Sequence, residues 1–148
     1  MKLIICGTCS RRLDVYVDAS GVRDIHPPSY VADHEPVPVE APDGWRGHCD
    51  FCFSDEPVAV LPTNDFPVPH MPASLSRGDW AACGMCSTLI GADRWERLVK
   101  RSVRKTADHH EVPVDVALLV STIALFAALR ENIRGPLRPL AEEAGSDG

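Results

Sequence analysis

The residues best suited to chemistry in this 148-residue chain are its six cysteines, all of which occur in Cys-x-x-Cys pairs. The pairs are Cys6 with Cys9, Cys49 with Cys52, and Cys83 with Cys86. Two residues between cysteines allow a tight turn, called a knuckle below, to aim both sulfurs at one point. Two knuckles then supply the four corners of a tetrahedral metal site. Local disulfides, or cysteines buried as small apolar residues, are the alternative, but the repeated spacing favours bound zinc.

The cysteine spacing leaves two arrangements of zinc ligands open. In the favoured arrangement one ion is bound by Cys49, Cys52, Cys83 and Cys86, and a second ion by Cys6, Cys9, His26 and His34. In the other arrangement the first two knuckles share an ion, and the third recruits His109 or His110. His48 competes with either histidine of the favoured arrangement. Both arrangements predict two structural zinc ions per chain, and the favoured one closes shorter loops.

The expected place of His26 follows from a predicted β-hairpin. Apolar residues at positions 13, 15 and 17 alternate with residues 14, 16 and 18, which is the period of a half-buried strand. Residues 19–21 form the turn, and residues 22–26 return as the partner strand. This register brings His26 back opposite Leu13, beside the first knuckle. The histidine can therefore complete a metal site there.

The segment from residue 27 to residue 44 is acidic and rich in proline, which predicts an extended connector with polyproline II geometry. A second module begins near Trp45, and five prolines between its two knuckles exclude a helix from that stretch. Short strands are predicted at 58–61 and 66–68. A further strand at 79–82 leads into the third knuckle.

The two later knuckles, Cys49-Asp50-Phe51-Cys52 and Cys83-Gly84-Met85-Cys86, resemble those of a zinc ribbon. In that family, paired knuckles on β-hairpins hold one structural metal ion. The first knuckle and its hairpin are similar to half a ribbon that histidines complete. The wider pattern also resembles small bacterial proteins with no assigned activity. The resemblance implies metal binding and a β-hairpin fold, whereas zinc ribbons serve many functions.

After Cys86 the apolar residues take the spacing of helices. Asp93 followed by Glu96 predicts a capping box for a helix that begins at Arg94. The apolar face of this helix consists of Trp95, Leu98, Val99, Ser102 and Val103. An arginine stripe on another face consists of Arg94, Arg97, Arg101 and Arg104. The stripe is either a solvated helix face or a surface that contacts the phosphates of a nucleic acid.

A second helix is predicted at about 114–133, after Pro113, and a frayed tail at 135–148. Its 14 uncharged residues, 116–129, are too few for a membrane span, which needs about 20. The helix is nevertheless apolar on nearly all sides. Small residues that would let another helix approach closely are Ala117, Ser121, Ala124 and Ala128. We therefore predict a homo-oligomer joined through residues 114–130, with no insertion into a membrane.

The net charge of −6 argues against a protein that binds nucleic acid over most of its surface. The charge is uneven, because residues 94–105 carry six basic residues and one acidic residue, or +5, which leaves −11 for the rest. The sequence contains no zinc-deaminase, zinc-protease, Walker or dinucleotide-binding motif. A closed four-cysteine site also lacks the open position of catalytic zinc. We therefore expect a protein that is not an enzyme.

Together these features predict an α+β protein. Two zinc-stabilised β-hairpin modules, at 1–44 and 45–92, precede two helices within 93–134 and a tail at 135–148. The N-terminal residues lack the apolar core of a signal peptide, so we expect a cytoplasmic protein with reduced cysteines. Two functions stay open: a protein-binding or assembly module, and a small regulator that binds nucleic acid through the 94–105 helix.

Overall fold

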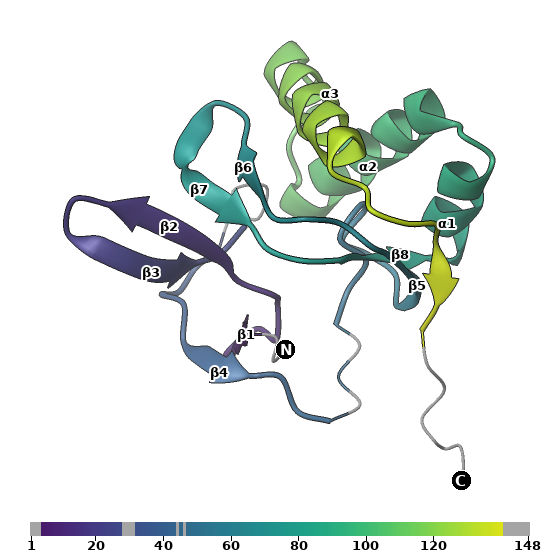
Figure 1. Ribbon diagram of the computed structural model, residues 1–148. Coiled ribbons are helices and arrows are strands. Elements are labelled where there is room, and N and C mark those ends of the chain that lie inside the picture. The colour runs from purple at the N-terminus through teal and green to yellow at the C-terminus, as the bar shows by residue number, and fades with distance from the viewer. Residues whose placement is uncertain (1–3, 28–31, 44, 46, 141–148) are drawn as a thin grey trace, which may run out of the picture.

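The computed structural model describes residues 4–27, 32–43, 45 and 47–140 (Figure 1). The fold is mixed α+β, as predicted, and its strands form antiparallel sheets. The strands are β1 (Ile4–Cys6), β2 (Asp14–Asp18), β3 (Gly21–Ile25), β4 (Pro38–Glu40), β5 (Pro57–Leu61), β6 (Phe66–Val68), β7 (Met71–Ser76), β8 (Trp80–Cys83) and β9 (Arg138–Pro139). The helices are α1 (Gly84–Gly91), α2 (Trp95–His110) and α3 (Val116–Glu131).

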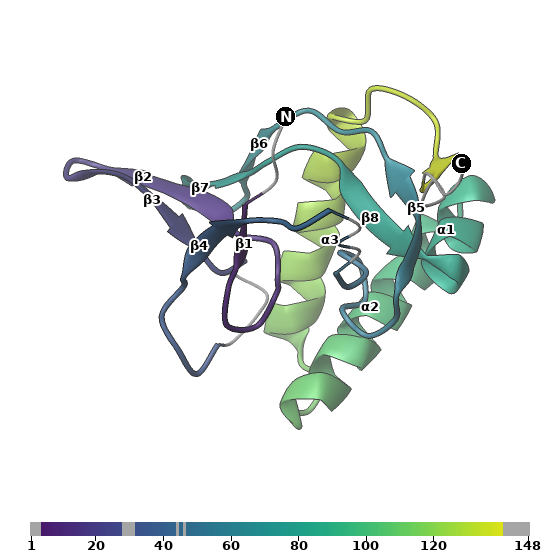
Figure 2. The ribbon, with the colours of Figure 1, turned by 90° about the horizontal axis from the view of Figure 1, so that it is seen from below.

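The strands form three sheets, and the helices gather at one side of them. The sheets have the strand orders β1-β4, β3-β2-β7-β6 and β8-β5-β9. All three helices lie together, and the β2–β3 hairpin projects away from them in both views (Figure 1 and Figure 2). Three helices in the described residues correct the prediction of two, because α1 was not expected.

The β2–β3 hairpin has the predicted register. Asp18 pairs with Gly21 across the turn, and Asp14 pairs with Ile25, which places His26 just beyond the strand end as expected. Gly21 has a φ of 129°, a conformation that favours glycine. The predicted alternation of burial fails at both ends of β2, because Asp14 is buried and Val17 is 48% exposed. The tip of the hairpin extends past the sheet, so Val17 meets solvent.

One sheet joins the two predicted zinc modules. Strand β2 pairs with β7 through Val15 opposite Leu75 and Tyr16 opposite Ser74. The predicted boundary at residue 44 is therefore crossed by strand pairing. Strand β7 was not predicted in the proline-rich stretch. The connector that was expected to be extended also contributes a strand, since β4 pairs with β1. Proline at the start of β4 is tolerated because both strands of a two-stranded sheet are edge strands.

Helix α1 begins directly at the third knuckle. Cys83 is its N-cap residue, and the Cys83 sulfur accepts a hydrogen bond from the backbone N–H of Cys86 at 3.5 Å. Strand β8, predicted at 79–82, runs into this cap. The chain therefore leaves the knuckle as a helix and not as the second strand of a ribbon hairpin. The first backbone N–H groups of a helix have no partner within the helix, so they can donate to the cysteine sulfurs of a knuckle. The turn at Cys83 is therefore both a knuckle and the start of a helix.

The capping box predicted at Asp93 does not form. Helix α2 begins at Trp95, and its N-cap residue Arg94 makes no side-chain capping bond within the described part of the chain. Asp93 instead takes a left-handed conformation with a φ of 57°, and the Arg94 N–H donates to the Leu89 carbonyl. The Asp93 carboxylate lies instead 3.8 Å from Nη2 of Arg130 on α3.

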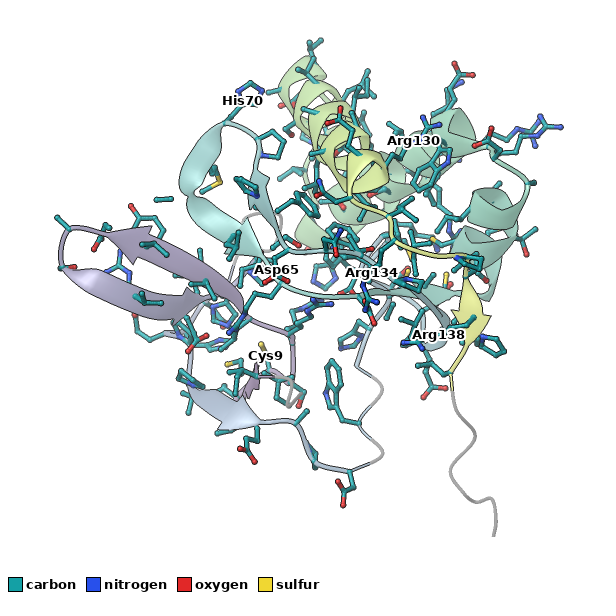
Figure 3. All side chains as sticks on the ribbon, viewed as in Figure 1. Cys9, Asp65, His70, Arg130, Arg134 and Arg138 are labelled. Carbon is teal, nitrogen blue, oxygen red and sulfur yellow. The ribbon has the colours of Figure 1, made fainter. Side chains whose placement is uncertain are left out.

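Residues 135–140, the first part of the tail predicted to fray, are ordered. Strand β9 pairs with β5 through Arg138 opposite Val60. Two arginines near it contact one carboxylate, because Asp79 accepts from Arg134 at 2.9 Å and from Arg138 at 3.3 Å. Figure 3 shows both arginines near β5 and β9. Residues 141–148, the rest of the predicted tail, lie outside the described residues.

The main core surrounds the second and third knuckles. It is a cluster of aromatic, aliphatic and cysteine side chains from β5, β6, β8 and the three helices. The predicted apolar face of α2 lies in it, with Leu98, Val99 and Val103 buried. Phe51, between the cysteines of the second knuckle, packs against Trp80 and Phe126 with ring centroids 5.1 Å and 5.5 Å apart. Phe51 and Trp80 are both buried in this core.

Candidate metal centres

The second and third knuckles bring four cysteines together inside the main core. The group consists of Cys49, Cys52, Cys83 and Cys86, called the four-cysteine centre below; all four are buried. Their sulfurs lie within 4.8 Å of one another. The loop before β5 supplies the first two cysteines, and the junction of β8 with α1 supplies the others. This group can hold a metal ion.

Backbone N–H groups of the two knuckles point at the sulfurs of the four-cysteine centre. The Phe51 N–H donates to the Cys49 sulfur at 3.4 Å, and the Cys86 N–H donates to the Cys83 sulfur at 3.5 Å. The Asp50 carboxylate accepts from the Ala81 N–H at 2.7 Å and so ties the loop to β8. These hydrogen bonds hold the sulfurs in position, as hydrogen bonds around the ligands do in structural metal sites.

Thiols this close cannot ionise independently. Hydrogen bonds among the sulfurs raise the pKa of Cys49 and lower that of Cys52, and the bond with Cys49 lowers the pKa of Cys83 to about 6. The pKa of Cys86 rises to about 12, where the bond from Cys49 is outweighed by the bond with Cys52 and by burial. Neighbouring thiolates repel each other at these separations. All four can be thiolates together only when a cation lies among them.

The first knuckle forms a second group with the two histidines of the favoured arrangement. It consists of Cys6, Cys9, His26 and His34, called the cysteine–histidine centre below. The Cys6 sulfur lies 3.4 Å from Nε2 of His34, and the Cys9 sulfur lies 3.6 Å from Nε2 of His26. Cys6 is buried, and the other three are half-buried. This group can also hold a metal ion, closer to the surface; Figure 3 shows Cys9 beside β1 and β4, away from the helices.

The electrostatics of the cysteine–histidine centre differ between its two cysteines: the thiolate is favoured at Cys6, whereas burial raises the pKa of Cys9. Burial raises the pKa of Cys6, but backbone hydrogen bonds at Val37, Cys9 and Thr8 outweigh it and bring the pKa to about 5. The thiolate is therefore the form present at neutral pH. His34 donates its Nδ1–H to the Asp33 carboxylate at 2.9 Å, and this contact raises the pKa of His34. It also leaves Nε2 directed at the centre, as in metal sites where a carboxylate orients the histidine.

The structure follows the first of the two arrangements considered for the ligands. Cys6 and Cys9 lie with His26 and His34, and not with the second knuckle. Among the described residues, His48 and His109 belong to neither group. The side chain of His110 lies outside the described ones. Asp33 was not singled out from the sequence, although its position next to His34 was a usable signal.

The predicted arginine stripe divides into exposed and half-buried members. Arg94, Arg97 and Arg104 are exposed. Arg101 instead points into the four-cysteine centre, where its Nη2 lies 3.8 Å from the Cys52 sulfur and 3.7 Å from the Cys83 sulfur. The helical spacing in the sequence grouped Arg101 with the exposed arginines. The structure distinguishes Arg101 from them, because α2 packs over the knuckles at this residue.

Two further findings bear on the class of protein. Among the described residues, each helix is too short or too polar to cross a membrane. Comparison of the chain with family models, with curated proteins and with solved structures found no match.

Proposed function

We propose that this chain is a non-enzymatic zinc protein that acts as an assembly module and self-associates through α3. Zinc is supported by the donors, four thiolates at one centre and two thiolates with two imidazoles at the other. Cys52 and Cys83 lie 3.8 Å apart, which is about the edge of a tetrahedron with zinc–sulfur bonds of about 2.3 Å. Soft thiolate ligands and tetrahedral geometry select zinc over hard cations. The reducing cytoplasm suits these thiolates.

The observation that carries self-association is an apolar seam on the outer face of α3. Val116, Val120, Ile123 and Ala127 are exposed there and follow one another at intervals of four, three and four residues. This is the spacing with which one helix packs along another. Val116 is 74% exposed, and Val120 and Ile123 are about half exposed. Leu119 adds a partly exposed side chain at the edge of the seam. A seam of this kind is unusual on a surface that stays in water.

The seam differs from the small-residue stripe predicted from the sequence. Ala117 and Ser121 are exposed, but Ala124 and Ala128 are half-buried, and Ala128 packs against the main core. The stripe therefore turns inward along the helix. Residues 114–130 remain the proposed contact region, with the seam in place of the stripe.

Charge favours a second copy of the same chain as the partner. Asp115 is the N-cap of α3, and Arg130, whose Nη2 lies 3.8 Å from the Asp93 carboxylate, is in its last turn. Two copies paired antiparallel about a two-fold axis place Asp115 of each near Arg130 of the other, whereas parallel pairing places like charges together. Such an isologous contact is closed, so it yields a dimer. A 16-residue helix is about 24 Å long, which suits a modest, concentration-dependent interface.

The test is light scattering on the full-length protein and on Val120→Glu. We expect the wild type to dimerise at micromolar concentration and the variant to be a monomer, because the glutamate would be buried without a partner. Val22→Glu is the matched control, since Val22 is an exposed valine on β3. Arg130→Glu should weaken the dimer about tenfold when the helices are antiparallel and leave it unchanged when they are parallel. A wild-type monomer would contradict the proposal.

A second candidate function is binding of nucleic acid by the exposed part of the arginine stripe. Arg97, Lys100 and Arg104 are exposed on α2, and their spacing of three and four residues puts them on one side of the helix. Basic side chains with this spacing would suit contacts to phosphates.

For this candidate we expect Arg97→Glu with Arg104→Glu to abolish binding to a duplex or a single strand. The slope of log affinity against log salt should fall by about two in the corresponding glutamine pair, because two phosphate contacts are lost. Fluorescence anisotropy over a salt series measures both. Arg101 is left intact, since it contacts the four-cysteine centre. Wild-type affinity that does not depend on salt would rule this candidate out.

A further inference from the structure

The two centres differ in the charge they carry when a divalent ion is bound. Two thiolates and two neutral imidazoles balance the ion, so the cysteine–histidine centre is neutral. Four thiolates exceed it by two negative charges, so the four-cysteine centre has a charge of −2. A net charge in a dry core is costly unless a partner of opposite sign lies next to it. The four-cysteine centre is the one whose ligands are all buried.

The side chains that touch the centres match these charges. A carboxylate, Asp33, contacts a histidine of the neutral centre. A guanidinium, Arg101, contacts two thiolates of the centre that carries excess negative charge. A cation next to a doubly negative thiolate group gains most where water is scarce, and the Arg101 side chain is only 19% exposed.

We propose that Arg101 is the charge partner of the four-cysteine centre, and that it retains the metal ion and protects the thiolates from electrophiles. The inference rests on the metal binding proposed above and is independent of self-association. A thiolate that accepts a hydrogen bond from a cation is a poorer nucleophile and a poorer base. Loss of this contact should therefore speed both alkylation of the sulfurs and release of the ion.

The position of Arg101 is held by contacts on both sides. Asp55 accepts from the same Nη2 at 2.9 Å and so fixes the guanidinium between a carboxylate and the sulfurs. The Nε of Arg101 is buried and makes no hydrogen bond to the part of the chain that is described. Burying an arginine with an unpaired donor is unfavourable unless a strong attraction offsets it. The negative charge of the four-cysteine centre supplies that attraction.

The experiment compares Arg101→Gln with Arg104→Gln in the full-length, metal-loaded protein. Arg104 is an exposed arginine of the same helix. Iodoacetamide labelling, resolved by cysteine with mass spectrometry, and zinc transfer to 4-(2-pyridylazo)resorcinol are followed over time. We expect Cys52 and Cys83 to be labelled about tenfold faster in Arg101→Gln, with Cys6 and Cys9 unchanged. One of the two zinc ions should transfer faster to a similar degree.

Other outcomes separate the possible failures. Equal labelling in Arg101→Gln and Arg104→Gln overturns the proposal while leaving metal binding intact. Faster labelling of all six cysteines in Arg101→Gln also overturns it, because general unfolding would then be the cause. Asp55→Asn keeps the guanidinium and loosens its position, so a smaller, about twofold acceleration at Cys52 and Cys83 supports it. A wild-type protein that holds no metal would refute the metal binding itself.

Discussion

Replacing Cys83 with serine should release one metal ion and unfold the helical half of the protein. Cys83 is buried, belongs to the main core and caps α1, so the change affects the metal centre, the packing and the helix start together. Structural zinc contributes about 10–16 kcal/mol to the folding of small zinc domains, and a typical domain has a net stability of only about 5–15 kcal/mol. The variant should therefore lack a cooperative unfolding transition.

Cys9→Ser is the matched change at the other centre. Cys9 is half-buried and lies outside the main core, so this variant should also lose one ion but keep the packing of Trp80 and Phe126. Atomic absorption gives the metal content, and near-ultraviolet circular dichroism with thermal unfolding reports on the core. Removal of both ions with a chelator should reproduce the Cys83→Ser result in the wild type. A Cys83→Ser protein with the core signal and the melting transition of the wild type would contradict the prediction.

Local spacing gave the ligand groups of both centres as the favoured one of two arrangements, and the structure brings those groups together. Each knuckle places two sulfurs within a few residues, and the β2–β3 register follows from alternation and a short turn. His26 could therefore be placed beside Cys9 without knowledge of the rest of the fold. His34 was harder, because its position depends on the loop that precedes β4. Both histidines lie within one module, which is the range over which local rules hold.

Long-range pairing could not be predicted from these patterns. The contact between β2 and β7 joins residues separated by about 60 positions, and no periodicity in either strand specifies its partner. Helix α1 was missed for a different reason. Its sequence, Gly84-Met85-Cys86-Ser87-Thr88, has weak helix formers, and the cap is a cysteine, which is not among the usual N-cap residues. Tertiary packing against β5 and α2 stabilises it instead.

The contact of Arg101 with the four-cysteine centre could not be predicted from the sequence, because it depends on how α2 crosses that centre. Its neighbours in the stripe, Arg97 and Arg104, are one helical turn away and exposed. Asp55, its partner, lies 46 residues earlier in the chain. A stripe of charged residues on a helix therefore predicts that most of its members are exposed. Arg101 is the exception, because it contacts the buried four-cysteine centre.

Besides the metal centres, a buried carboxylate in β2 affects the stability of the protein. Asp14 is 8% exposed and lines a cavity of about 60 Å³ with Arg12, Asp50 and Trp80. Burial, and to a lesser extent the nearby Asp50, raises the pKa of Asp14 to about 7, although Arg12 and Arg77 partly oppose this. The unfolded chain loses the same proton near pH 4. The contribution of Asp14 to folding is therefore most favourable at low pH, where Asp14 is protonated in both states, and it becomes unfavourable as the pH rises from about 4 to about 7.

Asp14→Asn should stabilise the protein at neutral and alkaline pH, because the amide has the shape of the carboxyl group and carries no charge. A pKa of about 7 in the folded state corresponds to about 4 kcal/mol above pH 7. The difference in free energy of unfolding between variant and wild type should grow by about 2 kcal/mol from pH 5.5 to pH 8. Chemical denaturation at fixed metal concentration measures it, and the metal centres contribute equally to both proteins. Asp43→Asn, at an exposed position, is the control and should show no such trend. If Asp14→Asn is less stable than the wild type, or if the difference in free energy of unfolding does not change with pH, the prediction is wrong and the Asp14 carboxylate is ionised at little cost.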